Sequence, residues 1–135
     1  MNARQWLSQL RPIEGEIEAL LEARRQEYER LTNVTQNISG DSVSGTKNPH
    51  KFDRLAELDD TIDELYCKKV GEKNKIIKAI SCVQNTRQRI VLFRRYVLGE
   101  TFEQIAVAIH YSYKQTCRIH GRALLAITEA MNERL

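Results

Sequence analysis

Residues 85–135 read NTRQRIVLFRRYVLGETFEQIAVAIHYSYKQTCRIHGRALLAITEAMNERL, and this stretch decides the fold class. Its apolar residues recur every three or four positions, a spacing that predicts amphipathic helices. The first helix is expected to run from about Thr86 to Leu98. Gly99 then provides the left-handed backbone conformation with which many helices end.

Two pairs of residues predict where the next helices begin. Thr101 with Gln104, and Ser112 with Gln115, have the three-residue spacing of capping boxes, in which each side chain bonds the backbone N–H of the other residue. A short second helix should therefore stop shortly before Ser112, and a longer third helix should open there. Two helices joined across three residues predict a helix-turn-helix, which completes a three-helix bundle over residues 84–135.

The spacing of the side chains also separates an inner face from an outer face. Ala106 is expected where the second and third helices cross, because only a small side chain lets two backbones approach closely. The buried positions of the third helix are expected to be Tyr113, Thr116, Ile119, Ala123 and Ile127. The opposite side carries the candidate site, which consists of Ser112, Lys114, Gln115, Arg118 and Arg122.

This outer face has the chemistry of a nucleic-acid contact. No acidic residue occurs between Glu103 and Glu129, so no acid offsets the cations of the third helix before its last turns. Lysine and arginine neutralise phosphates, and glutamine and arginine also form paired hydrogen bonds with purine edges. Because the N-terminal turn of such a helix enters the major groove, we expect double-stranded DNA to be the partner. The competing interpretation is a basic face that is only solvated.

Residues 1–83 differ in character and predict a long antiparallel helical hairpin that resembles a coiled coil. Apolar residues follow spacings of three and four from Trp6 onwards, pause at Arg24 and resume at Tyr28. The segment 39–51, rich in Gly, Ser and Asn, is expected to be the loop between the two helices. Paired helices of this kind set the oligomeric state of many proteins, so we expect a homodimer or a higher homo-oligomer through the hairpin.

Two features of the hairpin concern its local structure. Pro12 disfavours helical geometry in the residue before it, which fits either a short helix ending near Arg11 or one kinked helix. Charged residues interrupt the apolar seam at Arg24, Lys69 and Glu72. We interpret them as residues that determine the register of the two helices and not as a binding site.

Charge is distributed unevenly along the 135 residues, whose net charge is +3. Residues 1–83 hold 13 Lys and Arg against 14 Asp and Glu, whereas residues 84–135 hold 8 against 4. Positive charge in the smaller part favours a polyanionic partner there. The sequence shows neither an apolar stretch of membrane-spanning length nor a secretory signal, so a cytoplasmic protein without membrane contact is expected.

The sequence contains no catalytic or metal-binding pattern. Cys67, Cys82 and Cys117 are odd in number and widely spaced, so buried thiols are expected in place of disulfides or a zinc pair. His120 lies one helical turn from Cys117, but two or three ligands do not complete a zinc site, and a structural or DNA-contacting role is expected for it. Nucleophile, zinc-protease and phosphate-loop motifs are lacking, so we expect neither an enzyme nor a cofactor.

The string IVLFRRYVLGETFEQIAVAIHYSYKQTCRIHGRALLAI, residues 90–127, resembles the fourth conserved region of bacterial RNA polymerase sigma factors. That resemblance implies a helix-turn-helix that reads promoter DNA in the major groove. The whole chain is similar to a family of phage and prophage proteins without a settled function. In that family an ARxWL segment, a charged helical hairpin and a C-terminal YSYxxxxRxHxxAL motif follow in this order, and here the two motifs are residues 3–7 and 111–124.

Two residues depart from the pattern of that family and of sigma factors. His110 stands where glycine is usual, so either the turn avoids the left-handed region or His110 bears a strain of about 1 kcal/mol. Thr116 stands where valine is usual. Its hydroxyl then needs a hydrogen-bond partner, such as a main-chain carbonyl one turn back.

The sequence leaves three functions open. The first is a phage-type transcriptional regulator that binds duplex DNA sequence-specifically through the third helix. The second is a sigma-like protein that docks on RNA polymerase and has little affinity for DNA. The third is a DNA-packaging accessory comparable to a small terminase subunit, in which the hairpin would drive formation of a ring.

Overall fold

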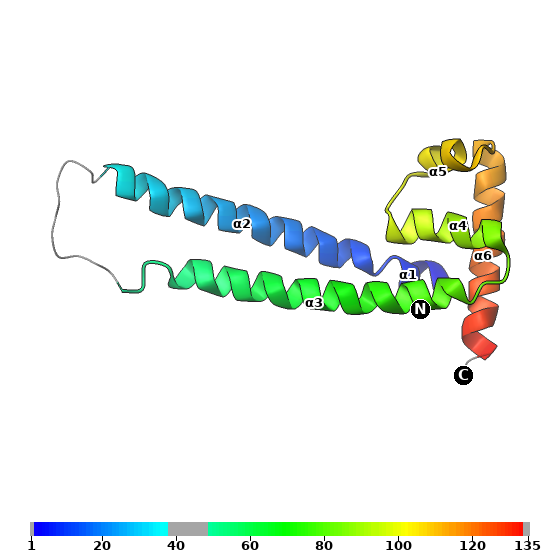
Figure 1. Cartoon of the computed structure of the whole chain (residues 1–135), viewed down its shortest axis with the longest axis horizontal. Helices are drawn as coiled ribbons and strands as arrows, with labels where there is room; N and C mark the ends of the chain where they lie inside the picture. Colours follow the sequence, from blue (N-terminus) through cyan, green and yellow to red (C-terminus); the bar gives the residue numbers. More distant parts are fainter. Residues whose placement is uncertain (1, 38–48, 134–135) are drawn as a thin grey trace. The chain divides into compact units, whose positions relative to one another are not determined.

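The computed structural model describes residues 2–37 and 49–133, and its regular structure there is entirely helical (Figure 1). The element order is α1 (Ala3–Leu7), α2 (Leu10–Asn37), α3 (Asp53–Ser81), α4 (Thr86–Leu92), the π-helical turn η1 (Phe93–Val97), α5 (Phe102–Ile109) and α6 (Tyr113–Glu133). No strand occurs in those residues, so the predicted all-α class is confirmed. Most of the predicted loop 39–51 lies outside the described residues. None of the helices described is long and apolar enough to cross a membrane.

The chain divides into two compact units. The terminal unit comprises Met1–Arg11 and Val70–Leu135, and the central unit comprises Pro12–Lys69. Both divisions fall inside a long helix, α2 or α3, whereas the sequence places a boundary at residue 83. The difference has a physical cause in the core of the terminal unit.

That core combines residues from both sides of the predicted boundary. Its buried members are Leu7, Leu10, Ile76, Ile80, Val83, Leu92, Tyr96, Ala123 and Ile127. α6 packs against α1, α4 and α5, and α5 also contacts η1. Because side chains of residues 76–83 share this core with α4 and α6, the end of α3 belongs to the terminal unit.

Two ion pairs connect α2 with α3 inside the central unit. Arg24 pairs with Asp59 at 2.5 Å, and Glu14 pairs with Lys69 at 3.6 Å. Residue numbers therefore rise along α2 as they fall along α3, which is the order of antiparallel neighbours. Two of the three charged residues of the predicted seam, Arg24 and Lys69, bond the facing helix, as a register role expects, whereas Glu72 pairs with Lys75 of its own helix.

The buried seam of α2 differs from the predicted seam. The sequence places Tyr28 on it, but that side chain is 55% exposed and Glu27 is buried instead. The spacing of three and four continues without a break from Ile17 to Leu31, and this register reaches Glu27. Arg30 hydrogen-bonds the Glu27 carboxylate and thereby holds its pKa below the usual value, so the buried position is charged and paired.

Near Pro12 the chain has the two helices of the first alternative, but the break lies before the predicted helix end near Arg11, which is inside α2. α1 ends at Leu7 and α2 begins at Leu10, so the chain forms two helices and the break falls at residues 8–9. Pro12 then occupies the first turn of α2, where a backbone N–H has no partner within the helix. The missing donor of proline costs no hydrogen bond at that position.

Candidate nucleic-acid interface

The end of η1 sets the direction in which the chain continues. η1 follows α4 directly, and the Leu98 N–H bonds the Phe93 carbonyl at 3.0 Å. Gly99 has a φ of 74°, and the Glu100 N–H returns to the Arg94 carbonyl at 2.9 Å. The predicted helix end at Gly99 is confirmed, but the π-helical last turn is a feature that the apolar spacing does not predict.

Two arginines connect η1 with the start of α5. Arg94 pairs with the Glu100 carboxylate at 3.0 Å, and Arg95 donates to the Glu100 carbonyl at 3.0 Å. The Arg95 guanidinium also lies over the Phe102 ring, 4.4 Å from its centroid. These contacts anchor the first residue of α5 to η1.

Both predicted capping boxes are present. The Thr101 N–H bonds Gln104 Oε1 at 2.9 Å, and the Gln104 N–H bonds Thr101 Oγ1 at 3.2 Å. In the same way the Ser112 N–H bonds Gln115 Oε1 at 3.2 Å, and the Gln115 N–H bonds Ser112 Oγ at 3.1 Å. Residues three apart in the sequence therefore determine where α5 and α6 begin.

The turn between α5 and α6 depends on a left-handed histidine. His110 has φ 62° and ψ 38°, which is the strained alternative predicted for this position. The next N–H, of Tyr111, bonds the carbonyl of buried Ala106 at 3.1 Å. The Arg87 guanidinium of α4 lies 5.1 Å from the centroid of the Tyr111 ring, so α4 also contacts the turn.

One side of α6 is buried in the terminal unit, although not through all of the predicted residues. Tyr113 is 52% exposed because it begins the helix, and its ring meets Phe102 edge-on instead of entering the core. The Thr116 hydroxyl donates to the Ser112 carbonyl at 2.9 Å, the partner that the sequence predicts one turn back. The buried residues of α6 are Thr116, His120, Ala123 and Ile127.

His120 is a buried residue that the predicted stripe omits, although its 4-3-4 spacing with Thr116, Ala123 and Ile127 could have revealed it. The side chain is 3% exposed, and its Nε2 lies 2.7 Å from the Tyr96 hydroxyl. Burial lowers the pKa of His120 to about 4. The ring is therefore neutral at pH 7 and faces the core. Of the structural and the DNA-contacting role expected for His120, its burial fits the structural one.

All five predicted site residues lie on the exposed surface. Lys114 and Arg122 are eight residues apart, so the cationic face extends along about 12 Å of helix, which is close to the width of the major groove. Within the described residues, Lys114, Arg118 and Arg122 make neither an ion pair nor a side-chain hydrogen bond. Their charges are therefore available to an external anion.

Ser112 and Gln115 also serve the fold. Gln115 Oε1 accepts hydrogen bonds from both the backbone N–H and the hydroxyl of Ser112. The Gln115 amide then has only its NH₂ group left for an external acceptor. The paired hydrogen bond with a purine edge that the sequence predicts for Gln115 requires this cap to open.

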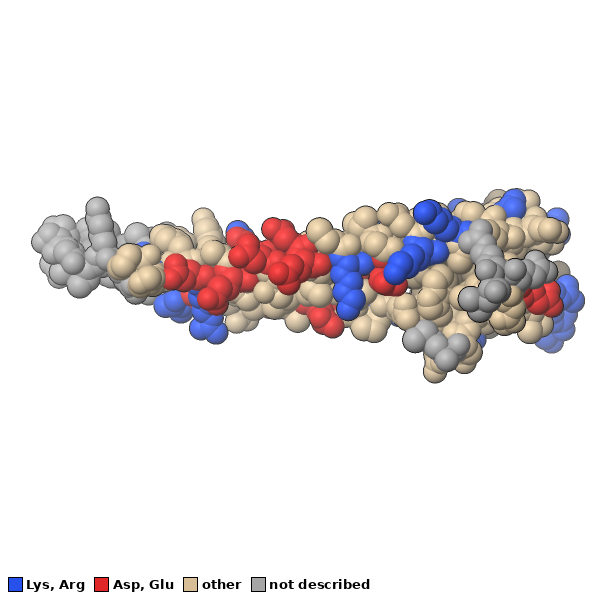
Figure 2. Space-filling model, turned by 90° about the horizontal axis from the view of Figure 1, so that it is seen from below, with Lys and Arg blue, Asp and Glu red and all other residues tan. Residues whose placement is uncertain are grey.

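The division into two units sharpens the charge contrast. The terminal unit contains 13 Lys and Arg against 5 Asp and Glu, a net charge of +8. The central unit contains 8 against 13, a net charge of −5, and Figure 2 shows acidic side chains gathered along its helices. The difference in net charge is smaller when the chain is divided at residue 83. That division assigns Arg4, Arg11 and three lysines of α3 to the acidic part.

The cysteines and possible metal ligands do not form a second site. Among the described residues, no group of three or more His, Cys, Asp or Glu side chains is placed to hold a metal ion. Cys67 is exposed, and Cys82 and Cys117 are partly exposed, so the prediction of buried thiols is wrong. Cys67 lies five residues after buried Ile62, about 140° around α3 and away from its seam.

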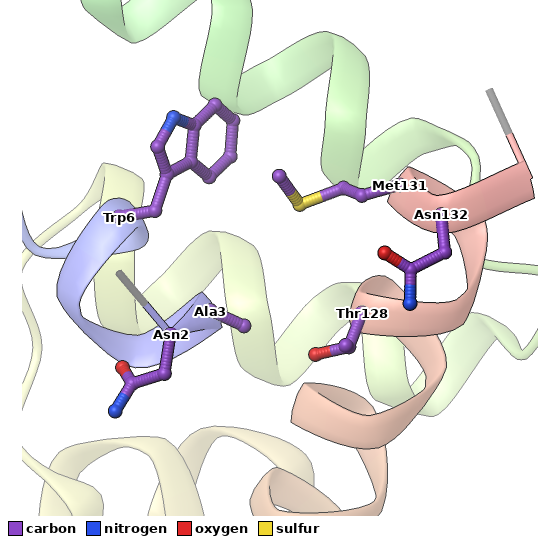
Figure 3. A pocket seen from close by; sticks show the side chains of 6 residues that line it. All are labelled: Asn2, Ala3, Trp6, Thr128, Met131 and Asn132. Carbon is purple, nitrogen blue, oxygen red and sulfur yellow. The ribbon is translucent and has the colours of Figure 1, made fainter. Parts of the chain in front are cut away.

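A pocket of about 210 Å³ lies between α1 and α6 in the terminal unit (Figure 3). The side chains of Trp6 and Met131 make its wall mainly apolar. Its lining residues are Asn2, Ala3, Trp6, Thr128, Met131 and Asn132, and none of them is charged. The pocket therefore lacks a cationic side chain, in contrast to the outer face of α6.

Comparisons with known proteins give no assignment. No protein-family model matches the chain, and neither a curated protein nor a solved structure is significantly similar to it. The candidate interface therefore rests on the exposure, the charge and the local geometry of α6.

The strain at His110 predicts opposite effects of two substitutions. His110→Gly should raise the free energy of unfolding by about 0.5–1 kcal/mol, because glycine adopts a positive φ without a clash of Cβ. Gly99→Ala should lower it by about 1 kcal/mol for the same reason, since a Cβ there meets no other atom and only the backbone is affected. Urea unfolding followed by circular dichroism measures both. If both substitutions changed the free energy of unfolding in the same direction, His110 would not be strained by its left-handed backbone.

The buried His120 predicts a loss of stability in mild acid. The unfolded chain takes up a proton near pH 6.5, whereas the folded protein does so only near pH 4. Between these values the unfolded state binds more protons, so the free energy of unfolding falls as the pH falls, and it is independent of this group above about pH 6.5. Urea unfolding of the wild type and of His120→Gln across this range should give a shallower pH slope for the variant. Parallel slopes would show that His120 titrates normally in the folded protein.

Proposed function

We propose that the protein is a DNA-binding transcriptional regulator of the phage type. In this proposal α5, the turn at residues 110–112 and α6 act as a helix-turn-helix, and α6 is the recognition helix in the major groove. The observation that carries the proposal is the exposed and unpaired cationic face of α6, formed by Lys114, Arg118 and Arg122. The sequence resemblance to the fourth region of sigma factors supports the same function.

The positions of the three cations suggest different roles on DNA. Lys114 lies in the first turn of α6, and Arg122 lies two turns further along. We assign phosphate contacts to both. When the middle of a helix enters the major groove, the positions before and after it lie near the two phosphate backbones that border the groove. Arg118 lies between them, where its guanidinium can form two hydrogen bonds with the O6 and N7 atoms of guanine.

The distribution of charge supports DNA contact through the terminal unit alone. A net charge of +8 attracts a polyanion over a distance of about a Debye length, whereas the −5 of the central unit opposes it. The anchored start of α6 adds to this support. The Ser112 cap and the buried stripe leave the helix little freedom to turn its cations away, so binding loses little conformational entropy.

Substitutions in α6 test the proposed interface. A preferred duplex is first selected from a random pool, and affinities for it and for a scrambled duplex are then measured by fluorescence anisotropy over a series of salt concentrations. Arg122→Ala should weaken both duplexes alike and reduce the slope of log K against log salt by about one. Arg118→Lys should keep most of the affinity for the scrambled duplex and lose about tenfold or more of the preference, because lysine cannot form the paired contact.

Lys68→Ala is the matched control, since it removes an exposed cation from α3 in the central unit. It should bind both duplexes as the wild type does. A wild-type protein without salt-dependent affinity for duplex DNA would overturn the proposal. Capture of core RNA polymerase by that same protein would favour the sigma-like docking function.

We also propose that the protein acts as a homodimer that joins through the central unit. Two large apolar side chains of α2 are exposed there at a heptad spacing, with Leu21 seven residues before Tyr28. Exposed apolar residues seven apart align along one edge of a helix, as in the contact faces of coiled coils. Two copies would present two recognition helices to two half-sites.

Light scattering measures the oligomeric state that this requires. The wild type should have the mass of a dimer, and Leu21→Ser/Tyr28→Ser should shift it to a monomer without unfolding it, because both side chains are exposed. Lys68→Ala should remain dimeric. A monomeric wild type would contradict the dimer, and a ring-sized mass would favour the DNA-packaging alternative.

A further inference from the structure

A second hollow in the terminal unit has a chemistry unlike that of the apolar pocket. It has a volume of about 270 Å³ and is lined by residues from the start of the chain, from η1, from α5 and from α6. Its charged lining residues are three arginines, Arg4, Arg11 and Arg95, and no carboxylate lines it. The buried Tyr96 and His120 also line this hollow.

The positive charge of this hollow is not balanced from within the described part of the chain. Glu100, five residues after Arg95, gives its carboxylate to Arg94 and offers only its backbone carbonyl to Arg95. Arg4 and Arg11 form no ion pair there. Burial raises the pKa of Tyr96, and the charges of Arg4, Arg95 and Arg11 oppose that shift, which shows that all three act on one point.

His120 does not alter this balance. Burial lowers its pKa to about 4, with a further contribution from the charges of Arg4 and Arg95, so the ring is neutral at pH 7. Three like charges that line one hollow repel one another. An anion between them would remove that repulsion and gain charge-assisted hydrogen bonds.

We propose that the hollow lined by Arg4, Arg11, Arg95 and Tyr96 binds a phosphate group. Guanidinium groups match the oxygens of phosphate with pairs of parallel N–H donors, and three of them can surround one tetrahedral anion. The Tyr96 hydroxyl lies 2.7 Å from His120 Nε2 and can contribute a further hydrogen bond to the anion if the ring donates to it in return.

This site is distinct from the proposed recognition face of α6. Arg118 and Arg122 each lie two residues from His120, which places them about 160° around the helix from it. A duplex held against Arg118 and Arg122 therefore lies on the far side of α6 from the hollow. The phosphate belongs either to a small phosphate ester or to a nucleic-acid strand other than the one in contact with that face.

The side chain of His120 reports binding at this site. The full-length protein is titrated with inorganic phosphate at constant ionic strength, and the pKa of His120 is followed by the NMR signals of its ring. Phosphate should raise that pKa measurably, because an anion offsets Arg4 and Arg95. In Arg4→Gln/Arg11→Gln the affinity for phosphate should fall by about tenfold or more, since two charge-assisted contacts are lost.

Arg118→Gln/Arg122→Gln is the matched control, because it removes two exposed arginines from the other side of α6. It should bind phosphate as the wild type does even though the proposed contact of α6 with DNA is removed, so failure of this proposal and failure of the proposed function are distinguishable. In this control variant, a His120 shift with AMP alone identifies a small ester, and a shift with short duplex DNA identifies a strand phosphate. The proposal would be overturned if chloride shifted the pKa of His120 as much as phosphate does. It would also be overturned if phosphate caused the same shift in Arg4→Gln/Arg11→Gln as in the wild type.

Discussion

Burial of one side of α6 is the constraint on which the rest of the terminal unit depends. Ala123 and Ile127 share a core with residues of α1, α3 and α4, and Thr116 and His120 extend the buried stripe toward α5. A helix with one side held in this way can present only the other side to water. The cations of α6 are therefore exposed because the positions between them are committed to packing, and the candidate interface is a consequence of the core.

Six arginines of the terminal unit occupy three kinds of surroundings, and Arg95 takes part in two of them. Arg94 and Arg95 connect η1 with α5 through Glu100 and the Phe102 ring, so they contribute to the fold. The exposed arginines of α6 make no ion pair or side-chain hydrogen bond within the described chain and suit an external duplex. Arg4 and Arg11 meet Arg95 around a hollow that no carboxylate lines, which suits a bound anion. A single net charge conceals these three situations.

Local structure and function place opposing demands on the turn before α6. The two capping boxes determine where α5 and α6 begin, and the space between them leaves His110 as the residue that must take a positive φ. The strain is tolerated because the surrounding contacts, including the Tyr111 N–H bond to Ala106, over-determine the turn. The cap of α6 uses the Gln115 side-chain oxygen as an acceptor, so fewer hydrogen bonds to a DNA base can be assigned to Gln115.

The sequence by itself determined the all-helical class, both capping boxes, the helix end at Gly99 and the exposed cations of α6. These features depend on interactions within about four residues, which the spacing of side chains expresses directly. The spacing also contained the buried positions of His120 and Glu27, which the predicted seams missed. Only the tertiary structure decided the exposure of Tyr113 and the assignment of residues 1–11 and 70–83 to the terminal unit. Those features depend on which helix lies opposite, and hence on contacts between residues far apart in the chain, which periodicity does not encode.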